Sequence, residues 1–360
     1  MKTKIFKIDP YNIDEAAQEA LRECAQVIKR GGLVCIPTET VYGLGANAYD
    51  ENAVRNIFKA KGRPSDNPLI VHISDYDMLE MIVNEEFLKH SDMKALADHF
   101  WPGPLTMIAP KTSIIPPCVS GGLDTVGVRF PLHPIARALI KEAGVPIAAP
   151  SANLSGKPSP TCFEHVRDDM MGRVDIIIDG GDASVGVEST VLDITSKPLN
   201  ILRPGAVTLD DINSVIQDTM EQDWHLAHGI DTSEAPKSPG LKYKHYAPSA
   251  PVYIFDADNC EKMVDAINKK IFIEKNKKLS VGVLATEENM RYYKGADIVQ
   301  SVGKRESSME HASALFTSLR RFDEAGVDVI FAEMLPQTGV GDAVMNRLYR
   351  AAAGRIIKCD

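Results

Sequence analysis

Two short apolar segments, LVCIP at 33–37 and LIVHI at 69–73, constrain the fold most strongly. Apolar runs of this length predict buried strands of an α/β sheet. Polar side chains gather where these strands begin or end: Thr38, Glu39 and Thr40 after the first, and Lys61, Arg63 and Asn67 before the second. Open α/β sheets bind ligands at the ends of their strands, so we expect a binding cleft at one edge of this sheet.

A short helix is predicted between the two strands. Asp50 can cap it, apolar residues at positions 54, 57 and 58 share one face, and Gly62 ends it. Lys61 and Arg63 then lie at its last turn, where cations complement the helix dipole. The alternative is an anion clamp completed by Asn67, because the arginine fork and the lysine ammonium suit phosphate oxygens. The pattern alone leaves both interpretations open.

Composition bounds the class of protein. A chain of 360 residues predicts two domains, and its net charge of −9 argues against a protein that coats nucleic acid, while leaving room for transient tRNA contact. The six cysteines are far apart without a C-x-x-C pair, so we expect reduced thiols and no zinc site. The N-terminus lacks a signal-peptide pattern and no apolar run approaches the ~20 residues of a membrane span, so we expect a cytoplasmic protein.

The stretch from Gly43 through Gly45 to Ala48 matches the G-x-G-x-x-G/A dinucleotide pattern. It begins seven residues beyond the predicted strand, and no acidic residue closes a second strand about 20 positions on. We therefore interpret it as a tight turn that requires glycine dihedral angles.

Further polar groups accompany later strands. In the strand at 125–130, Thr125, Gly127 and Arg129 share one face, and the missing side chain at Gly127 would let a ligand approach. Arg129 is then well placed to pair with a carboxylate, the alternative being an arginine on an exposed strand face. The strand at 145–149 ends in PSANLSG, whose small residues suit a phosphate, and another strand ends at Arg203. His72 can be a core histidine or a substrate contact.

The second half of the chain is simpler. A helix is predicted over 209–223, proline and glycine then mark a linker over 229–250, and strands alternate with helices from Val252 onward, which predicts a small parallel α/β domain. His225 and His228 have helical metal-ligand spacing but no third ligand, so we do not predict a metal site there.

The candidate site residues form two groups. Lys61, Arg63 and Arg203 with the neutral donors Asn67, Thr125, Ser151 and Ser159 suit a nucleoside triphosphate, and Thr40, His72, Arg129 and Ser189 suit a small zwitterion. The chain has neither a Walker pattern nor a spacing that predicts a catalytic triad. Adenylation, in which an oxyanion attacks the α-phosphorus of ATP, needs neither motif, because positioning of the reactants and neutralisation of their charge supply most of the rate enhancement.

The motifs PTETVYGLG, KGRPSDNPLIVHI, TVGVRFP, APSANLSG, GVESTVLD and ILRPG resemble those of the YrdC-like threonylcarbamoyl-AMP synthases, and SPGLKYKHYAP resembles a segment of their two-domain members. The resemblance implies an α/β fold with a YrdC-like twisted mixed sheet flanked by helices, and a smaller Rossmann-like parallel α/β domain. We expect a catalytic domain at 1–208, a linker at 209–250 whose SPGLKYKHYAP segment lies over the active site, and the second domain at 251–360.

The resemblance also implies a role for each candidate residue. L-threonine would be held by Thr40, His72, Arg129, the backbone of Ala149, and Ser189. ATP would be held by Lys61, Arg63, Asn67, Thr125, Ser151, Asn153, Ser159, Arg203 and Tyr246. Lys61 and Arg63 would contribute by positioning, no general base is identified, and Mg²⁺ would arrive with ATP rather than on protein side chains.

The implied reaction is that of a nucleotidyltransferase. L-threonine, bicarbonate or CO₂, and ATP would give L-threonylcarbamoyl-AMP and pyrophosphate, and separate proteins would transfer the threonylcarbamoyl group to the adenosine beside the anticodon of tRNA. Two alternatives remain: an RNA-binding module without adenylating activity, which the acidic charge disfavours, and a carbamoyltransferase, which would normally carry additional domains that are not recognised here.

Overall fold

The computed structural model describes residues 2–216 and 246–359. Contacts divide the chain into two units: Met1–Ser155 with Ser159–Tyr243, and Gly156–Pro158 with Lys244–Asp360. No helix in the described part is long and apolar enough to cross a membrane. All six cysteines are free thiols.

The first unit is built on a ten-stranded mixed sheet with the order β1-β8-β2-β3-β7-β4-β6-β5-β9-β10. Its strands are β1 Lys4–Lys7, β2 Val34–Ile36, β3 Gly43–Asn47, β4 Ile70–His72, β5 Leu105–Pro110, β6 Thr125–Arg129, β7 Ile147–Ala148, β8 Ile176–Asp179, β9 Thr190–Asp193 and β10 Asn200–Arg203. The predicted mixed α/β architecture is confirmed.

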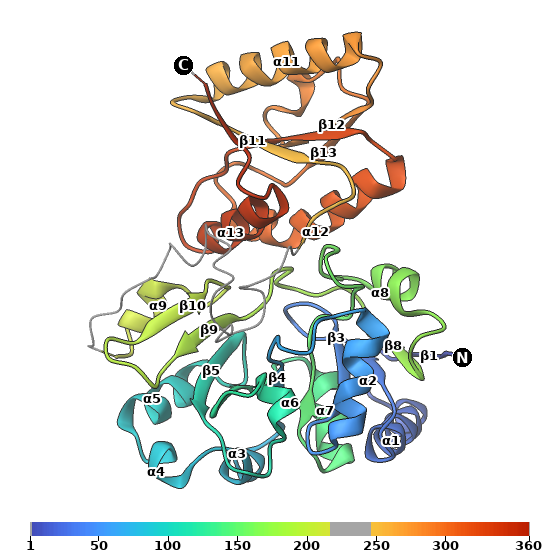
Figure 1. The fold of residues 1–360 in the computed structure, drawn as a ribbon, viewed down its shortest axis with the longest axis vertical. Helices are drawn as coiled ribbons and strands as arrows, with labels where there is room; N and C mark the ends of the chain where they lie inside the picture. The colour runs from blue at the N-terminus through green and yellow to red at the C-terminus, as the bar shows by residue number, and fades with distance from the viewer. Residues whose placement is uncertain (1, 217–245, 360) are drawn as a thin grey trace. The chain divides into compact units, whose positions relative to one another are not determined.

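Helices cover this sheet, and Figure 1 shows α1, α2 and α7 gathered beside β3 and β8. They are α1 Glu15–Lys29, α2 Glu51–Lys61, α3 Tyr76–Ile82, α4 Glu85–Leu88, α5 Ser91–Phe100, α6 Pro117–Ser120, α7 Pro134–Ala143, α8 Phe163–Met170 and α9 Leu209–Asn213.

Local chemistry sets the bounds of the predicted helix between β3 and β4. The side chain of Asp50 accepts hydrogen bonds from the backbone N–H groups of Asn52 and Ala53, and Gly62 ends α2 in the left-handed conformation. Val54 and Ile57 are fully buried on its inner face. The expected cap, apolar face and stop are confirmed, and Lys61 is fixed at the last turn.

The tight turn expected at 43–48 is wrong, because Gly43–Asn47 form strand β3 between β2 and β7. Neither glycine has a positive φ. A Cβ atom on Gly45 would lie 2.8 Å from Cγ2 of Ile147, and one on Gly43 would lie 3.3 Å from Cβ of Ala149. Glycine is therefore required here for close approach to β7 rather than for its dihedral freedom.

Two further expectations need correction. The helix predicted over 209–223 ends at Asn213, and residues from 217 lie outside the described part. The charged N-terminus, for which no strand was predicted, forms β1, which pairs in parallel with β8 at the sheet edge. Trp101 is buried: it is 6% exposed and its indole N–H donates to the Leu105 carbonyl.

The second unit contains a five-stranded parallel sheet in the order β13-β12-β14-β11-β15. Figure 1 shows α11 on one side of this sheet and α12 and α13 on the other. Its elements are β11 Val252–Ala257, α11 Cys260–Asn276, β12 Val281–Ala285, η1 Met290–Tyr292, β13 Ile298–Ser301, α12 Ser308–Ala325, β14 Val329–Glu333, α13 Gly341–Ala351 and β15 Ile356–Cys359. The predicted parallel α/β domain is confirmed.

We predict that Leu44→Ala in β3 lowers the free energy of unfolding by about 2–5 kcal/mol, because Leu44 is fully buried and truncation leaves a cavity. Denaturant unfolding followed by circular dichroism measures the change. Leu132→Ala is the matched control, since Leu132 is 51% exposed and should shift stability by less than about 0.5 kcal/mol. Equal shifts for the two variants would contradict the assigned burial of β3.

Candidate functional site

His72 and Arg129 lie side by side at the carboxyl ends of the parallel strands β4 and β6, where the sheet register pairs them directly. Arg129 donates through Nη1 to the Thr40 hydroxyl at 2.8 Å and through Nε to the Gly103 carbonyl at 3.2 Å. Thr40 is presented by the loop after β2, 89 residues earlier in the chain. Three of the residues predicted to hold an amino acid are thus brought together.

Glu39 completes this end of the site, although its position after β2 had not singled it out as a site residue. Its Oε1 lies 2.7 Å from Arg129 Nη2, and both side chains are about 95% buried. Its Oε2 accepts a hydrogen bond from the backbone N–H of His133 at 3.3 Å. Burial alone would raise the pKa of Glu39, but the Arg129 guanidinium outweighs it and holds the pKa below the usual range.

His72 is electrically neutral in this environment. Burial is the main cause, and the neighbouring Arg129 cation adds to it, so the pKa of His72 falls to about 3. Its Nδ1 atom is buried and has no hydrogen-bond partner. A buried polar atom without a partner is costly unless a ligand or water satisfies it, so this nitrogen is a candidate ligand contact.

A chain of hydroxyl groups extends this end of the site across β5 and β9. Thr106 is the register partner of Arg129, and its hydroxyl lies 2.8 Å from that of Ser189. Arg203 Nη2 donates to the Ser189 hydroxyl at 3.1 Å and to its carbonyl at 3.0 Å. Arg203, predicted to hold ATP, therefore meets Ser189, predicted to hold threonine, at one place.

A second group lies toward the amino end of β4. The Lys61 ammonium is 2% exposed and donates to the backbone carbonyls of Ser151 and Asn153. The Ser151 hydroxyl donates to the Asn153 side-chain oxygen. Ala149 N–H donates to the Ile70 carbonyl at 2.9 Å, so the backbone there is already used by the sheet. Lys61 thus fixes the loop that follows β7.

Asn67 carries the clearest sign of a missing polar partner in this group. It is 1% exposed, and both its side-chain oxygen and nitrogen lack hydrogen-bond partners. Arg63 donates to the Pro68 carbonyl beside it at 3.3 Å, and Thr125 begins β6. Ser159 is fully buried and its hydroxyl contacts Oε1 of Glu188. Cationic and amide donors buried together suit an anionic ligand.

The two groups lie along one face of the sheet, and one member of each marks an opposite end of strand β6. Thr125 is at the amino end of β6 and Arg129 at its carboxyl end, which separates them by about 13 Å of strand. Gly127 lies between them, and a Cβ atom there would come within 3.3 Å of Ile108 and Thr106 side-chain atoms. Ile70, Ile108, Val191 and Leu202 form an apolar cluster on this face. The face is therefore apolar in the middle and polar at both ends.

Tyr246 belongs to the second unit, where its ring stacks on Phe316 with centroids 5.4 Å apart and the Arg347 guanidinium lies 5.9 Å from its centroid. Its predicted contact with ATP stays a prediction. The rest of the 209–250 linker from 217 to 245, with His225, His228 and most of the SPGLKYKHYAP segment, lies outside the described residues.

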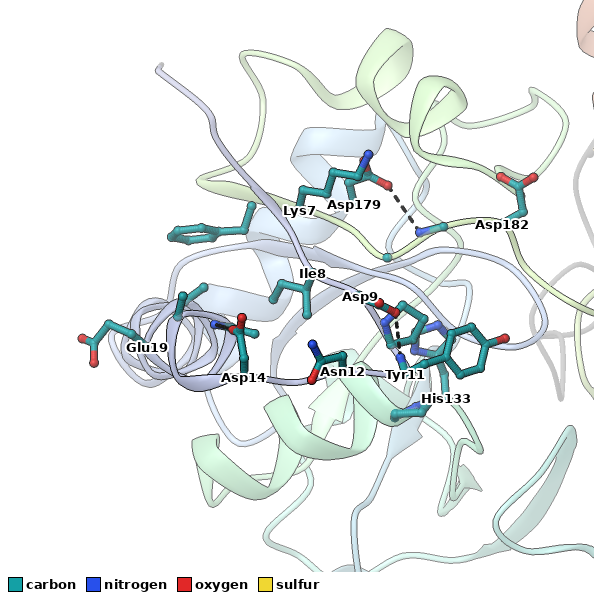
Figure 2. A pocket seen from close by; sticks show the side chains of 18 of the residues that line it. Lys7, Ile8, Asp9, Tyr11, Asn12, Asp14, Glu19, His133, Asp179 and Asp182 are labelled. Carbon is teal, nitrogen blue, oxygen red and sulfur yellow. Dashed lines mark hydrogen bonds between the residues drawn. The ribbon is translucent and has the colours of Figure 1, made fainter.

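A cavity of about 1310 Å³ lies beside Glu39, and Figure 2 shows Asp9, Tyr11 and His133 in its wall. None of the residues predicted to bind threonine or ATP lines it. Seven carboxylate residues and two lysines line it, so a triphosphate would be repelled by the charge of this cavity.

Among residues 2–216 and 246–359, no group of three or more His, Cys, Asp or Glu side chains could hold a metal ion.

Comparison with known proteins gives the family. Residues 26–205 match the family of Sua5, YciO and YrdC proteins described as "Telomere recombination", and residues 207–353 match "Threonylcarbamoyl-AMP synthase, C-terminal domain". The chain is 47% identical to the threonylcarbamoyl-AMP synthase of Bacillus subtilis, over 99% of this chain and 100% of that protein. It belongs to the Sua5-type threonylcarbamoyl-AMP synthases.

Other members of this family agree over the whole chain. The threonylcarbamoyl-AMP synthase of Pyrococcus abyssi is 46% identical over 96% of this chain and 98% of that protein. The crystal structure of P. abyssi Sua5 complexed with L-threonine superposes with a TM-score of 0.91 at 44% identity, covering 99% and 100% of the two chains. The predicted family, fold and nucleotidyltransferase class are confirmed, and the RNA-binding alternative is not needed.

We predict that His72 makes the protein less stable as pH falls from about 6.5 to about 3. The unfolded chain takes up this proton near its ordinary pKa, whereas the folded state does so only near pH 3, so falling pH favours unfolding across that window. The His72→Gln variant lacks this titrating group, so the loss should be absent from it. The free energy of unfolding of the wild type, relative to that of the variant, should therefore fall as the pH is lowered from about 6.5 to about 3. Denaturant unfolding at a series of pH values measures it, and parallel curves would contradict the neutral histidine.

Proposed function

We propose that the chain forms L-threonylcarbamoyl-AMP and pyrophosphate from L-threonine, bicarbonate or CO₂, and ATP, on the sheet face that joins Thr125 to Arg129. The observation that supports this assignment is the pair of polar groups near the opposite ends of strand β6. A carboxylate fits at the Arg129 end and phosphates fit at the Lys61 and Arg63 end. An acyl adenylate is a molecule with these two ends.

At the threonine end, Arg129 would pair with the substrate carboxylate, since an arginine fork matches a carboxylate with two parallel hydrogen bonds. Thr40 and Ser189 would hold the polar groups of threonine, and the buried Nδ1 of neutral His72 would gain a partner. The P. abyssi relative was crystallised with L-threonine, which supports this choice of substrate. The backbone of Ala149 would line the same space between the two ends.

At the ATP end, the donors would neutralise and orient the phosphates. Lys61 and Arg63 would supply charge, and Asn67 would supply a buried amide whose oxygen and nitrogen have no hydrogen-bond partner. The family resemblance adds Thr125, Ser151, Asn153, Ser159, Arg203 and Tyr246 as further proposed ATP ligands. The carbamate formed on the threonine amine would attack the α-phosphorus in line, and pyrophosphate would leave. Such a displacement relies on positioning and charge stabilisation rather than on a covalent enzyme intermediate.

Mg²⁺ would enter with ATP, held mainly by phosphate oxygens and water, because the donor group here is cationic and amidic rather than carboxylate-rich. The ion would neutralise charge that develops on the phosphates. The product would pass to cytoplasmic proteins that complete threonylcarbamoyladenosine modification of tRNA, with transient tRNA contact by this chain.

We predict that pyrophosphate release from ATP requires both L-threonine and bicarbonate, because the attacking carbamate contains atoms from each. The measurement is pyrophosphate release with each substrate withheld in turn, with product confirmed by mass spectrometry. Release that is indifferent to both omissions would contradict the proposed reaction.

We predict that Arg129→Ala raises the KM for threonine and Arg63→Ala raises the KM for ATP, each by at least about tenfold, because a hydrogen bond to a charged group contributes about 1.5–3 kcal/mol. Arg55→Ala is the matched control, since Arg55 lies on α2 near Arg63 with its side chain 67% exposed. Steady-state kinetics with each substrate varied separates the two ends. The assignment fails if both variants raise the same KM.

A further inference from the structure

The ion pair between Glu39 and Arg129 sets the charge at one end of the pocket that is proposed to bind threonine. A role for this pair in substrate specificity rests on that proposed function. The groups in contact with Arg129 are the Glu39 carboxylate, the Thr40 hydroxyl and the Gly103 carbonyl. Thr106 and Ser189, which continue the pocket, are neutral, and beyond them lies a second cation, Arg203, whose Nη2 donates to the Ser189 hydroxyl at 3.1 Å. His72, the register neighbour of Arg129, is neutral as well. The positive charge of Arg129 is therefore matched by one negative charge before any substrate arrives.

Glu39 is held in place from several directions. The backbone N–H of His133 donates to its Oε2 at 3.3 Å, and the backbone N–H of Val185 donates to its carbonyl at 2.8 Å. The next residue, Thr40, accepts a backbone hydrogen bond from Gly186 at 3.1 Å. Glu39 is also one of the residues that line the cavity beside Asp9 and His133, where carboxylate residues outnumber lysines. Arg129 is thus the cation that neutralises Glu39.

We propose that Glu39 determines specificity for a zwitterion by positioning and neutralising Arg129. With Arg129 already paired, its end of the pocket presents a neutral ion pair, which suits a molecule with no net charge such as L-threonine. An anion of the same shape brings one unbalanced negative charge into a buried site, next to the Glu39 carboxylate, and like charges in a buried site repel strongly. Glu39 acts through Arg129 and through charge, so it is a positioning residue rather than a catalytic one.

The direct test compares two ligands that differ by the amine alone. (R)-3-hydroxybutyrate has the carboxylate and hydroxyl of threonine but lacks the amine, so it is an anion. Calorimetric titration of the full chain with each ligand gives the ratio of their dissociation constants. In Glu39→Gln, the side chain keeps its shape while the pocket gains one net positive charge, so we expect the preference for threonine over hydroxybutyrate to fall by about tenfold or more.

Two variants control this comparison. Glu39→Asp shortens the side chain but keeps its charge, so it should retain the preference of the wild type to within about threefold. Glu19→Gln removes a carboxylate that lines the same cavity with 73% of its side chain exposed, and should leave the ratio unchanged. Thermal unfolding without ligand establishes that each variant is folded.

A measurement on the wild type alone keeps the proposal testable if the Glu39 variants do not fold. L-threoninamide is a cation of the same shape, and next to the Glu39–Arg129 pair both the cation and the anion should bind more weakly than threonine. Binding of hydroxybutyrate as tight as that of threonine overturns the proposal, and so does an unchanged ratio in Glu39→Gln or an equal loss in Glu39→Asp. If threonine does not bind, or Arg129→Ala binds it normally, the proposed function itself fails.

Discussion

The buried ion pair between Glu39 and Arg129 is the interaction on which the arrangement of the site depends. It joins the loop after β2 to the end of β6, 90 residues later, and it lies almost wholly out of solvent. A buried pair gains little net stability, because desolvation offsets the attraction, but removing one partner leaves a charge that the interior cannot satisfy. The pair therefore specifies where the loop after β2 must lie. Thr40 follows Glu39 directly, so the same constraint places its hydroxyl against Arg129.

Around this pair, the sheet supplies the geometry that loops alone would not. β4, β6, β5 and β9 are neighbours, and their register aligns His72, Arg129 and Thr106 in one row with Val191. Ser189 and Arg203 extend the row through side-chain hydrogen bonds. A row fixed by backbone pairing is stiff, because moving one member requires breaking ladder hydrogen bonds. Such rigidity suits an enzyme that is proposed to work by holding reactants in line.

Much of this could be read from the sequence, since it depends on local patterns. The Asp50 cap, the Gly62 stop and the alternation at 125–130 each follow from neighbours within a few residues, and the family motifs contain the candidate residues other than Ser159. Local patterns could not show the pairing between distant strands. Glu39 gained its partner only through β6, and Thr106 gained its place only through the register of β5 with β6. Gly43 and Gly45 were misinterpreted for the same reason: the need for glycine comes from β7, about a hundred residues away.

The strand β6 also sets a fixed distance within the proposed site. Thr125 and Arg129, the proposed binding residues at its two ends, are separated by backbone of nearly constant rise, so their spacing follows from peptide geometry rather than from flexible segments. Because a shift of one residue turns every side chain to the opposite face, residues that share a face of a regular strand are spaced in steps of two residues, about 6.6 Å. A chain built in this way cannot drift gradually toward slightly longer or shorter substrates. Adaptation to a substrate of a different length would need a step of two residues along this strand, which the pairing of the strands rarely permits.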